Sequence, residues 1–81
     1  MIFTTQDIGT ISHGIDGSDQ YVILTCVDED CTPQQAIDWL LPQVYRESSH
    51  AGAYFCRHVS ATPMPYRDDQ VIAIIHHQYD V

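Results

Sequence analysis

The chain contains no lysine, and its three arginines face nine aspartates and two glutamates. The formal net charge is −8 at pH 7 over 81 residues. A small protein this acidic repels nucleic acid and anionic membranes and attracts basic surfaces. The shortage of positive charge therefore argues against direct binding to nucleic acid or to a membrane, and it favours a basic protein partner.

Long apolar runs are missing as well. No stretch approaches the roughly 18–20 apolar residues that a helix needs to cross a bilayer. The first residues, Met1 to Asp7, lack the basic start and apolar segment of a secretory signal. We therefore expect a soluble, cytoplasmic protein. The four glycines form no phosphate-binding loop pattern.

Cysteine is scarce, and its count is odd. Cys26, Cys31 and Cys56 cannot all pair within one chain, so we expect free thiols in a reducing compartment. Cys26 and Cys31 have a C-x4-C spacing, and Cys56 lies two residues from His58, which would share its face of a strand. A small metal or thiol site centred on Cys56 and His58 is the alternative. Structural zinc sites favour tighter spacings, so the main hypothesis includes no metal and no cofactor.

One helix has a clear start signal. Thr32 supplies an N-cap hydroxyl, proline follows in the first turn, and glutamine stands three residues after the cap. Apolar residues then recur at the spacing of one helical face: Ile37, Leu40, Leu41 and Val44. Pro42 interrupts this stripe, so the helix is expected to kink or to end near it and restart. We expect the helix to be over by about Glu47, with a loop at 48–52.

Four other segments are rich in β-branched and aromatic residues, which favour strands. The expected strands are 2–4 or 8–12, then 21–27, 53–59 and 71–77. The continuous apolar stretch Val71–Ile75 is typical of a central strand. The order predicts a single α+β domain over residues 1–81, with an antiparallel sheet of about four strands and one main helix packed on one face.

The carboxylates gather in the connections between these elements. One cluster precedes the helix and a second lies in the loop before the last strand, where a tyrosine accompanies it. Tyrosine at a loop is a suitable interface anchor. We expect a partner-binding surface built from these residues: Asp28, Glu29, Asp30, Asp68, Asp69 and Tyr66. The alternative is that the acidity serves only solubility.

No catalytic signature accompanies these clusters. Carboxylates in polar loops stay solvated, whereas catalytic carboxylates are expected at pocket positions that perturb them. No sharp glycine turn presents Cys56 as a nucleophile. We therefore expect a protein that is not an enzyme.

The stretch from Val44 to Phe55 takes a helix end through a polar glycine loop into an aromatic strand. Together with the small size, the acidity and the element order, it resembles phage-encoded anti-CRISPR proteins that act on type I surveillance complexes. The resemblance implies a stoichiometric inhibitor in the host cytoplasm. Such an inhibitor occupies a nucleic-acid groove lined by lysine and arginine, or an effector-recruiting surface.

The sequence thus predicts an acidic binding protein that inhibits a nucleic-acid-binding complex. A structural or assembly subunit that forms a homodimer through an exposed strand is a third alternative. The sequence leaves open the choice between monomer and homodimer. It also does not show whether the two acidic loops adjoin, because that depends on the order of the strands.

Overall fold

The computed structural model describes residues 1–14, 17–50 and 54–79, with side chains described for 1–14, 17–44 and 58–78. Four strands and one helix follow one another along the chain: β1 (Phe3–Ser12), β2 (Gly17–Cys26), α1 (Pro33–His50), β3 (Tyr54–Pro63) and β4 (Gln70–Tyr79). In the described part of the chain, no helix is both long and apolar enough to span a membrane.

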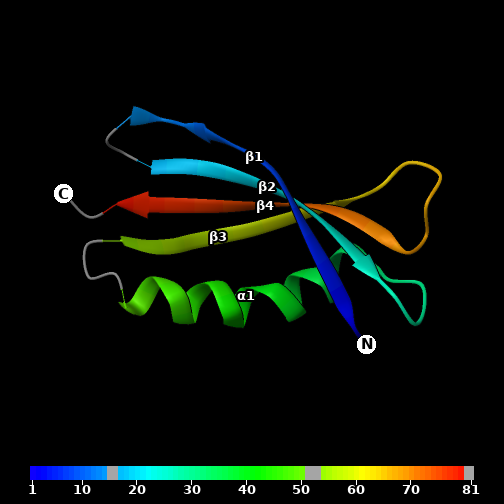
Figure 1. Cartoon of the computed structure of the whole chain (residues 1–81). Helices are drawn as coiled ribbons and strands as arrows, with labels where there is room; N and C mark the ends of the chain where they lie inside the picture. Colours follow the sequence, from blue (N-terminus) through cyan, green and yellow to red (C-terminus); the bar gives the residue numbers. More distant parts are fainter. Residues whose placement is uncertain (15–16, 51–53, 80–81) are drawn as a thin grey trace.

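The strands form one antiparallel sheet in the order β1-β2-β4-β3. The helix lies along one side of this sheet, mainly against β3 and β4 (Figure 1). The predicted α+β fold with the element order β-β-α-β-β is confirmed, as is the central position of β4. Its neighbours are β2, from before the helix, and β3, from after it.

The helix begins as its capping signal predicts. The backbone N–H of Gln35 donates to Thr32 Oγ1 at 3.2 Å, and the backbone N–H of Thr32 donates to Gln35 Oε1 at 2.9 Å. These reciprocal bonds satisfy two backbone donors near the helix start. Pro33, which has no N–H to satisfy, is the first helical residue.

The predicted end of the helix is wrong. The helix continues through Pro42 to His50, so Ser48 and Ser49 are helical and not part of a loop. Pro42 removes one hydrogen bond of the helix, yet it faces solvent while Leu40 and Val44 on the other side are buried. Leu41, predicted on the same apolar face, is instead exposed, so packing of Leu40 and Val44 carries the helix past its proline.

All four strand predictions were too short. The two candidate segments for the first strand join into β1 through a register shift between Asp7 and Gly9. β2 starts at Gly17 and not at residue 21, β3 runs on to Pro63, and β4 runs on to Tyr79. The reason is long-range pairing, because the start of β2 pairs with the polar end of β4, Gly17 with Gln78 and Asp19 with His76.

The core lies between α1 and the face of the sheet that it covers. Its buried members come from the helix and all four strands: Phe3, Val22, Leu24, Cys26, Ala36, Leu40, Val44, Val59, Val71, Ala73 and Ile75. The ring of Phe3 packs against that of Trp39 with centroids 5.3 Å apart. Trp39 is the only tryptophan of the chain, so its fluorescence reports on this core.

Two glycines give a matched test of close strand packing. Gly17 has φ 145° and Gly9 has φ 140°, both in the region that favours glycine. A Cβ on Gly17 would overlap the carbonyl oxygen of His77, whereas no described atom lies within 4 Å of a Cβ on Gly9. Gly9→Ala should destabilise by about 1–3 kcal/mol through backbone strain. Gly17→Ala should cost about 1–3 kcal/mol more, because β2 and β4 must separate.

Urea unfolding followed by Trp39 fluorescence measures both costs. Equal destabilisation by the two substitutions would contradict the close approach of β2 to β4 at Gly17.

Candidate functional site

The two acidic loops meet at one end of the molecule. The backbone N–H of Cys26 donates to the carbonyl oxygen of Asp69 at 2.8 Å, and that of Cys31 donates to the carbonyl oxygen of Asp68 at 2.9 Å. Both loops lie at the end of the sheet where β2 finishes and β4 begins (Figure 1). The adjacency follows from the pairing of Thr25 with Gln70. We call this region, residues 28–30 and 66–69, the acidic end.

The acids of this region differ in the hydrogen bonds that their carboxylates make within the chain. Asp28 Oδ1 accepts hydrogen bonds from the backbone N–H of Ile2 at 3.1 Å and from the Cys26 thiol at 3.0 Å. These two bonds, led by the one from Cys26, lower the pKa of the Asp28 carboxyl. Asp28 is exposed, as are Glu29 and Asp30, but its carboxylate ties the start of β1 to the end of β2.

The second loop contains its own counter-charge. Arg67 donates to Asp69 through Nε and Nη2, both at 2.9 Å. This fork lowers the pKa of Asp69 and raises that of Arg67. Asp69 is therefore largely neutralised within the loop, whereas the neighbouring Asp68 is exposed. Of the five predicted contact acids, Glu29, Asp30 and Asp68 are the most available to a partner.

Tyr66 occupies an unusual position between these charges. Its side chain is fully exposed, with a relative accessibility of 104%. Its backbone has φ 65°, and among the described residues Tyr66 is the only one other than glycine with positive φ. The left-handed conformation costs a residue with a Cβ on the order of 1–2 kcal/mol. The loop thus presents an aromatic ring to solvent at a conformational cost.

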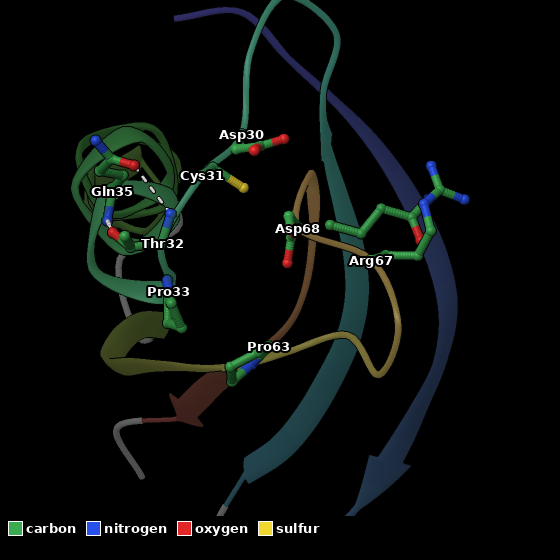
Figure 2. Close-up of a pocket in the computed structure, with 9 residues that line it drawn as sticks. Asp30, Cys31, Thr32, Pro33, Gln35, Pro63, Arg67 and Asp68 are labelled. Carbon is green, nitrogen blue, oxygen red and sulfur yellow. Dashed lines mark hydrogen bonds between the residues drawn. The ribbon is translucent and has the colours of Figure 1, made fainter.

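A cavity of about 360 Å³ separates the acidic loops from the start of α1. Figure 2 shows the Cys31 thiol and the Asp68 side chain beside it, with Pro33 and Pro63 on its other side. Burial raises the pKa of the Cys31 thiol, and the nearby Cys26 and Asp69 add to that effect. The thiol is therefore protonated at neutral pH and is a poor nucleophile.

The alternative site at Cys56 and His58 lies only partly within the described residues. The register of β3 shifts between these residues, so Cys56 pairs with His77 and His58 with His76. The Cys56 side chain lies outside the described part of the chain, so the prediction that it shares a face of the strand with His58 stays a prediction. Among described residues, no group of three or more His, Cys, Asp or Glu is placed to hold a metal.

Sequence reasoning missed a polar network at the opposite end of the sheet. Asp19 Oδ1 lies 2.8 Å from His76 Nδ1, and Asp19 Oδ2 lies 2.9 Å from His13 Nε2. His76 Nε2 in turn lies 3.3 Å from Ser60 Oγ, and the ring of His58 stacks on that of His76 with centroids 5.2 Å apart. The hydrogen bonds from His13 and then His76 lower the pKa of Asp19.

Ser60, His76 and Asp19 are connected through the same ring nitrogens as the catalytic triad of serine hydrolases. Such hydrolases place the serine on a sharp turn beside free backbone N–H groups that stabilise an oxyanion. Ser60 instead lies within a regular strand, paired with Ile74. The network therefore links β2, β4 and β3 through their side chains, and its geometry does not favour hydrolysis. Only the strand register reveals it, since its members lie far apart in the sequence.

Comparison of the chain with protein-family models found no match, and comparisons with curated proteins and with solved structures found none either. The functional argument therefore depends on the geometry of the described residues.

The Asp19 network predicts a specific loss of stability in acid. The pKa of Asp19 is lowered from 3.8, so its contribution is complete above pH 3.8 and is lost as the pH falls through the lower, folded-state value. Asp19→Asn should therefore flatten the decline of stability at acidic pH. His13→Asn should move the pKa of Asp19 back towards 3.8, because the bond from His13 is the largest cause of the shift.

Carbon-detected NMR titration of the Asp19 carboxyl measures the shift directly, and urea unfolding at several pH values measures its effect on stability. An Asp19 carboxyl that titrates at or above 3.8 in the folded protein would refute this assignment.

Proposed function

We propose that this chain is a non-enzymatic binding protein whose acidic end occupies a basic protein surface of the kind that normally holds nucleic acid. The observation that carries the proposal is the pair of backbone hydrogen bonds from Cys26 to Asp69 and from Cys31 to Asp68. They fix two separate acidic loops beside each other, so their carboxylates act on one partner surface. Scattered charge would serve solubility equally well, whereas a fixed cluster provides directed attraction.

The charges of the acidic end suit association with a basic groove. Exposed carboxylates at Glu29, Asp30 and Asp68 compete with phosphates for arginine and lysine side chains. The net charge of −8 steers a basic partner from a distance, and the attraction weakens as salt shortens the screening length. Asp28 and Asp69, which hold the loops through Cys26 and Arg67, stabilise the shape of the surface.

Tyr66 supports binding over solubility alone. A soluble surface gains nothing from a fully exposed aromatic ring on a strained residue. Strain of this kind is found at functional sites, and tyrosine is enriched among the residues that dominate interface energies. In the proposed complex, Tyr66 adds apolar contact area between charged contacts.

The resemblance to anti-CRISPR proteins gives the proposal a more specific form. In that form the partner is a type I surveillance complex or its effector, and binding inhibits it by excluding nucleic acid. Part of the resembling segment, residues 51–53, lies outside the described residues. The specific form is supported by the acidity, the size and the element order.

A charge reversal tests the acidic contact. Asp30→Lys should reduce the rate constant for partner association on the order of tenfold at low salt, and it should flatten the dependence of that rate on salt. Asp38→Lys makes the same change at an exposed residue of α1, where Asp38 accepts a bond from Gln34. This control should have a much smaller effect.

The immobilised chain should capture basic nucleic-acid-binding proteins from a bacterial lysate at low salt, and high salt or competing DNA oligonucleotides should release them. Surface plasmon resonance with the captured protein then gives the rates. Capture that neither salt, DNA nor Asp30→Lys diminishes would exclude an acidic contact.

A substitution at Tyr66 should affect partner binding without reducing the stability of the fold. Tyr66→Gly relieves a left-handed backbone and removes a side chain that is fully exposed, so unfolding should require the same free energy or up to about 1 kcal/mol more. Binding to the captured partner should weaken by at least about tenfold, as expected for an aromatic anchor. Unfolding curves and titration calorimetry measure the two effects. Unchanged affinity would remove Tyr66 from the interface.

A further inference from the structure

The strand register shows what lies on the face of the sheet that α1 does not cover. Core residues such as Val22, Leu24 and Ala73 alternate with neighbours that point the other way. On this uncovered side Tyr21 pairs with Ile74 and Ile23 pairs with Ile72. We call this side the open face. Its centre consists of these four apolar residues from the two central strands.

An open face of this composition is unusual. An antiparallel sheet with one packed face normally shows alternation between apolar residues inside and polar residues outside. Here β2 and β4 are apolar on both faces along their centres, and Tyr21, Ile23, Ile72 and Ile74 are half-buried with no described element above them. Ile11, at the β1 edge of the same face, is 55% exposed. The apolar pattern favours a second layer that the chain itself does not supply.

The charge distribution supports the same conclusion. Among the described residues of the open face, Asp19 is the only carboxylate, and its oxygens are bonded to His76 and His13. The polar atoms near the centre are likewise satisfied internally, because Ser60 Oγ bonds to His76 and Thr25 Oγ1 accepts from Gln70. Covering this face would therefore leave few polar groups without partners, which keeps the desolvation cost low.

We propose that the open face binds a second copy of this chain, forming a homodimer in which two sheets pack face to face. Four ten-residue strands, about 4.8 Å apart with a rise of about 3.3 Å per residue, cover roughly 600 Å² before side-chain relief is added. Specific interfaces bury roughly 600–1,000 Å² per partner. The face therefore reaches the lower end of this range before side-chain relief is counted, and its nearly neutral surface is complementary to itself.

Electrostatics selects the orientation of the dimer. When the two sheets pack with their strands roughly aligned, the two-fold axis lies in the plane of the interface, either close to the strand direction or across it. An axis along the strands would place both acidic ends together, whereas an axis across them places the acidic ends at opposite ends of an assembly. The second arrangement keeps Asp30 and Asp68 of each copy exposed and away from the partner's. The dimer is then compatible with binding through the acidic end, and it does not depend on that proposed function.

The test is sedimentation equilibrium of the full chain from about 1 µM to about 1 mM, a range that covers weak to moderate dimers. The wild-type chain should dimerise, and Ile72→Glu should raise the dissociation constant at least about 100-fold by placing a charge in the interface. Leu41→Glu is the matched control, because Leu41 is 39% exposed on α1, which lies on the other side of the sheet from the open face (Figure 1). It should leave the dimer intact.

Ile72→Glu could also disrupt folding, and Trp39 fluorescence would reveal this. Ile72→Thr is the milder second variant, because threonine is also β-branched. It should weaken the dimer about tenfold or more. A wild-type chain that stays monomeric over the whole range would overturn the proposal. So would equal effects of Ile72→Glu and Leu41→Glu, or a folded Ile72→Thr that dimerises normally.

The response to salt distinguishes this dimer from binding at the acidic end. Each copy has a net charge of −8, so added salt should strengthen dimerisation by screening repulsion, while it weakens binding to a basic partner. Asp30→Lys should weaken partner binding and leave the dimer intact or stronger. A dimer that dissociates at high salt, or that Asp30→Lys disrupts, would contradict packing through the open face.

Discussion

The pairing of β2 with β4 is the constraint on which the rest of the structure depends. It joins a strand from before the helix to one from after it, with Leu24 opposite Val71 at the centre of the core. At one end it places the two acidic loops within backbone hydrogen-bonding distance, and at the other it places Asp19 beside His76. Along its length it creates two faces, one covered by α1 and one open. The acidic end, the polar network and the apolar open face all follow from this register.

Local signals in the sequence sufficed for the element types and the helix start, because capping by Thr32 and Gln35 involves residues three apart. They failed for the helix end at His50 and for the start of β2, where tertiary packing and strand pairing outweigh Pro42 and a turn-like composition. The register shift in β3 between Cys56 and His58 was also not predicted. A bulge is fixed by the partner strand, and the sequence does not name that partner.

The sequence predicted that the acidic residues gather in two loops, but it did not predict which carboxylates are bonded within the chain. Charge clustering indicated two acidic loops, and strand order then showed that they adjoin. That Asp28 bonds to the Cys26 thiol and Asp69 to Arg67, while Glu29, Asp30 and Asp68 are exposed, depends on side-chain geometry. The strain at Tyr66 likewise appears only in its backbone conformation. The exposed acids and this tyrosine together make a surface suited to a basic partner, and the near-neutral open face makes a second surface of opposite character.

The central claim is that the acidic end is the surface that meets the basic partner. Its most direct test is NMR mapping of backbone amides when unlabelled partner, captured at low salt, is added to the isotopically labelled chain. The account predicts that chemical-shift changes concentrate at Glu29 to Cys31 and at Tyr66 to Asp69. Changes concentrated instead on the open face around Ile23 and Ile72, with the acidic end unaffected, would contradict it.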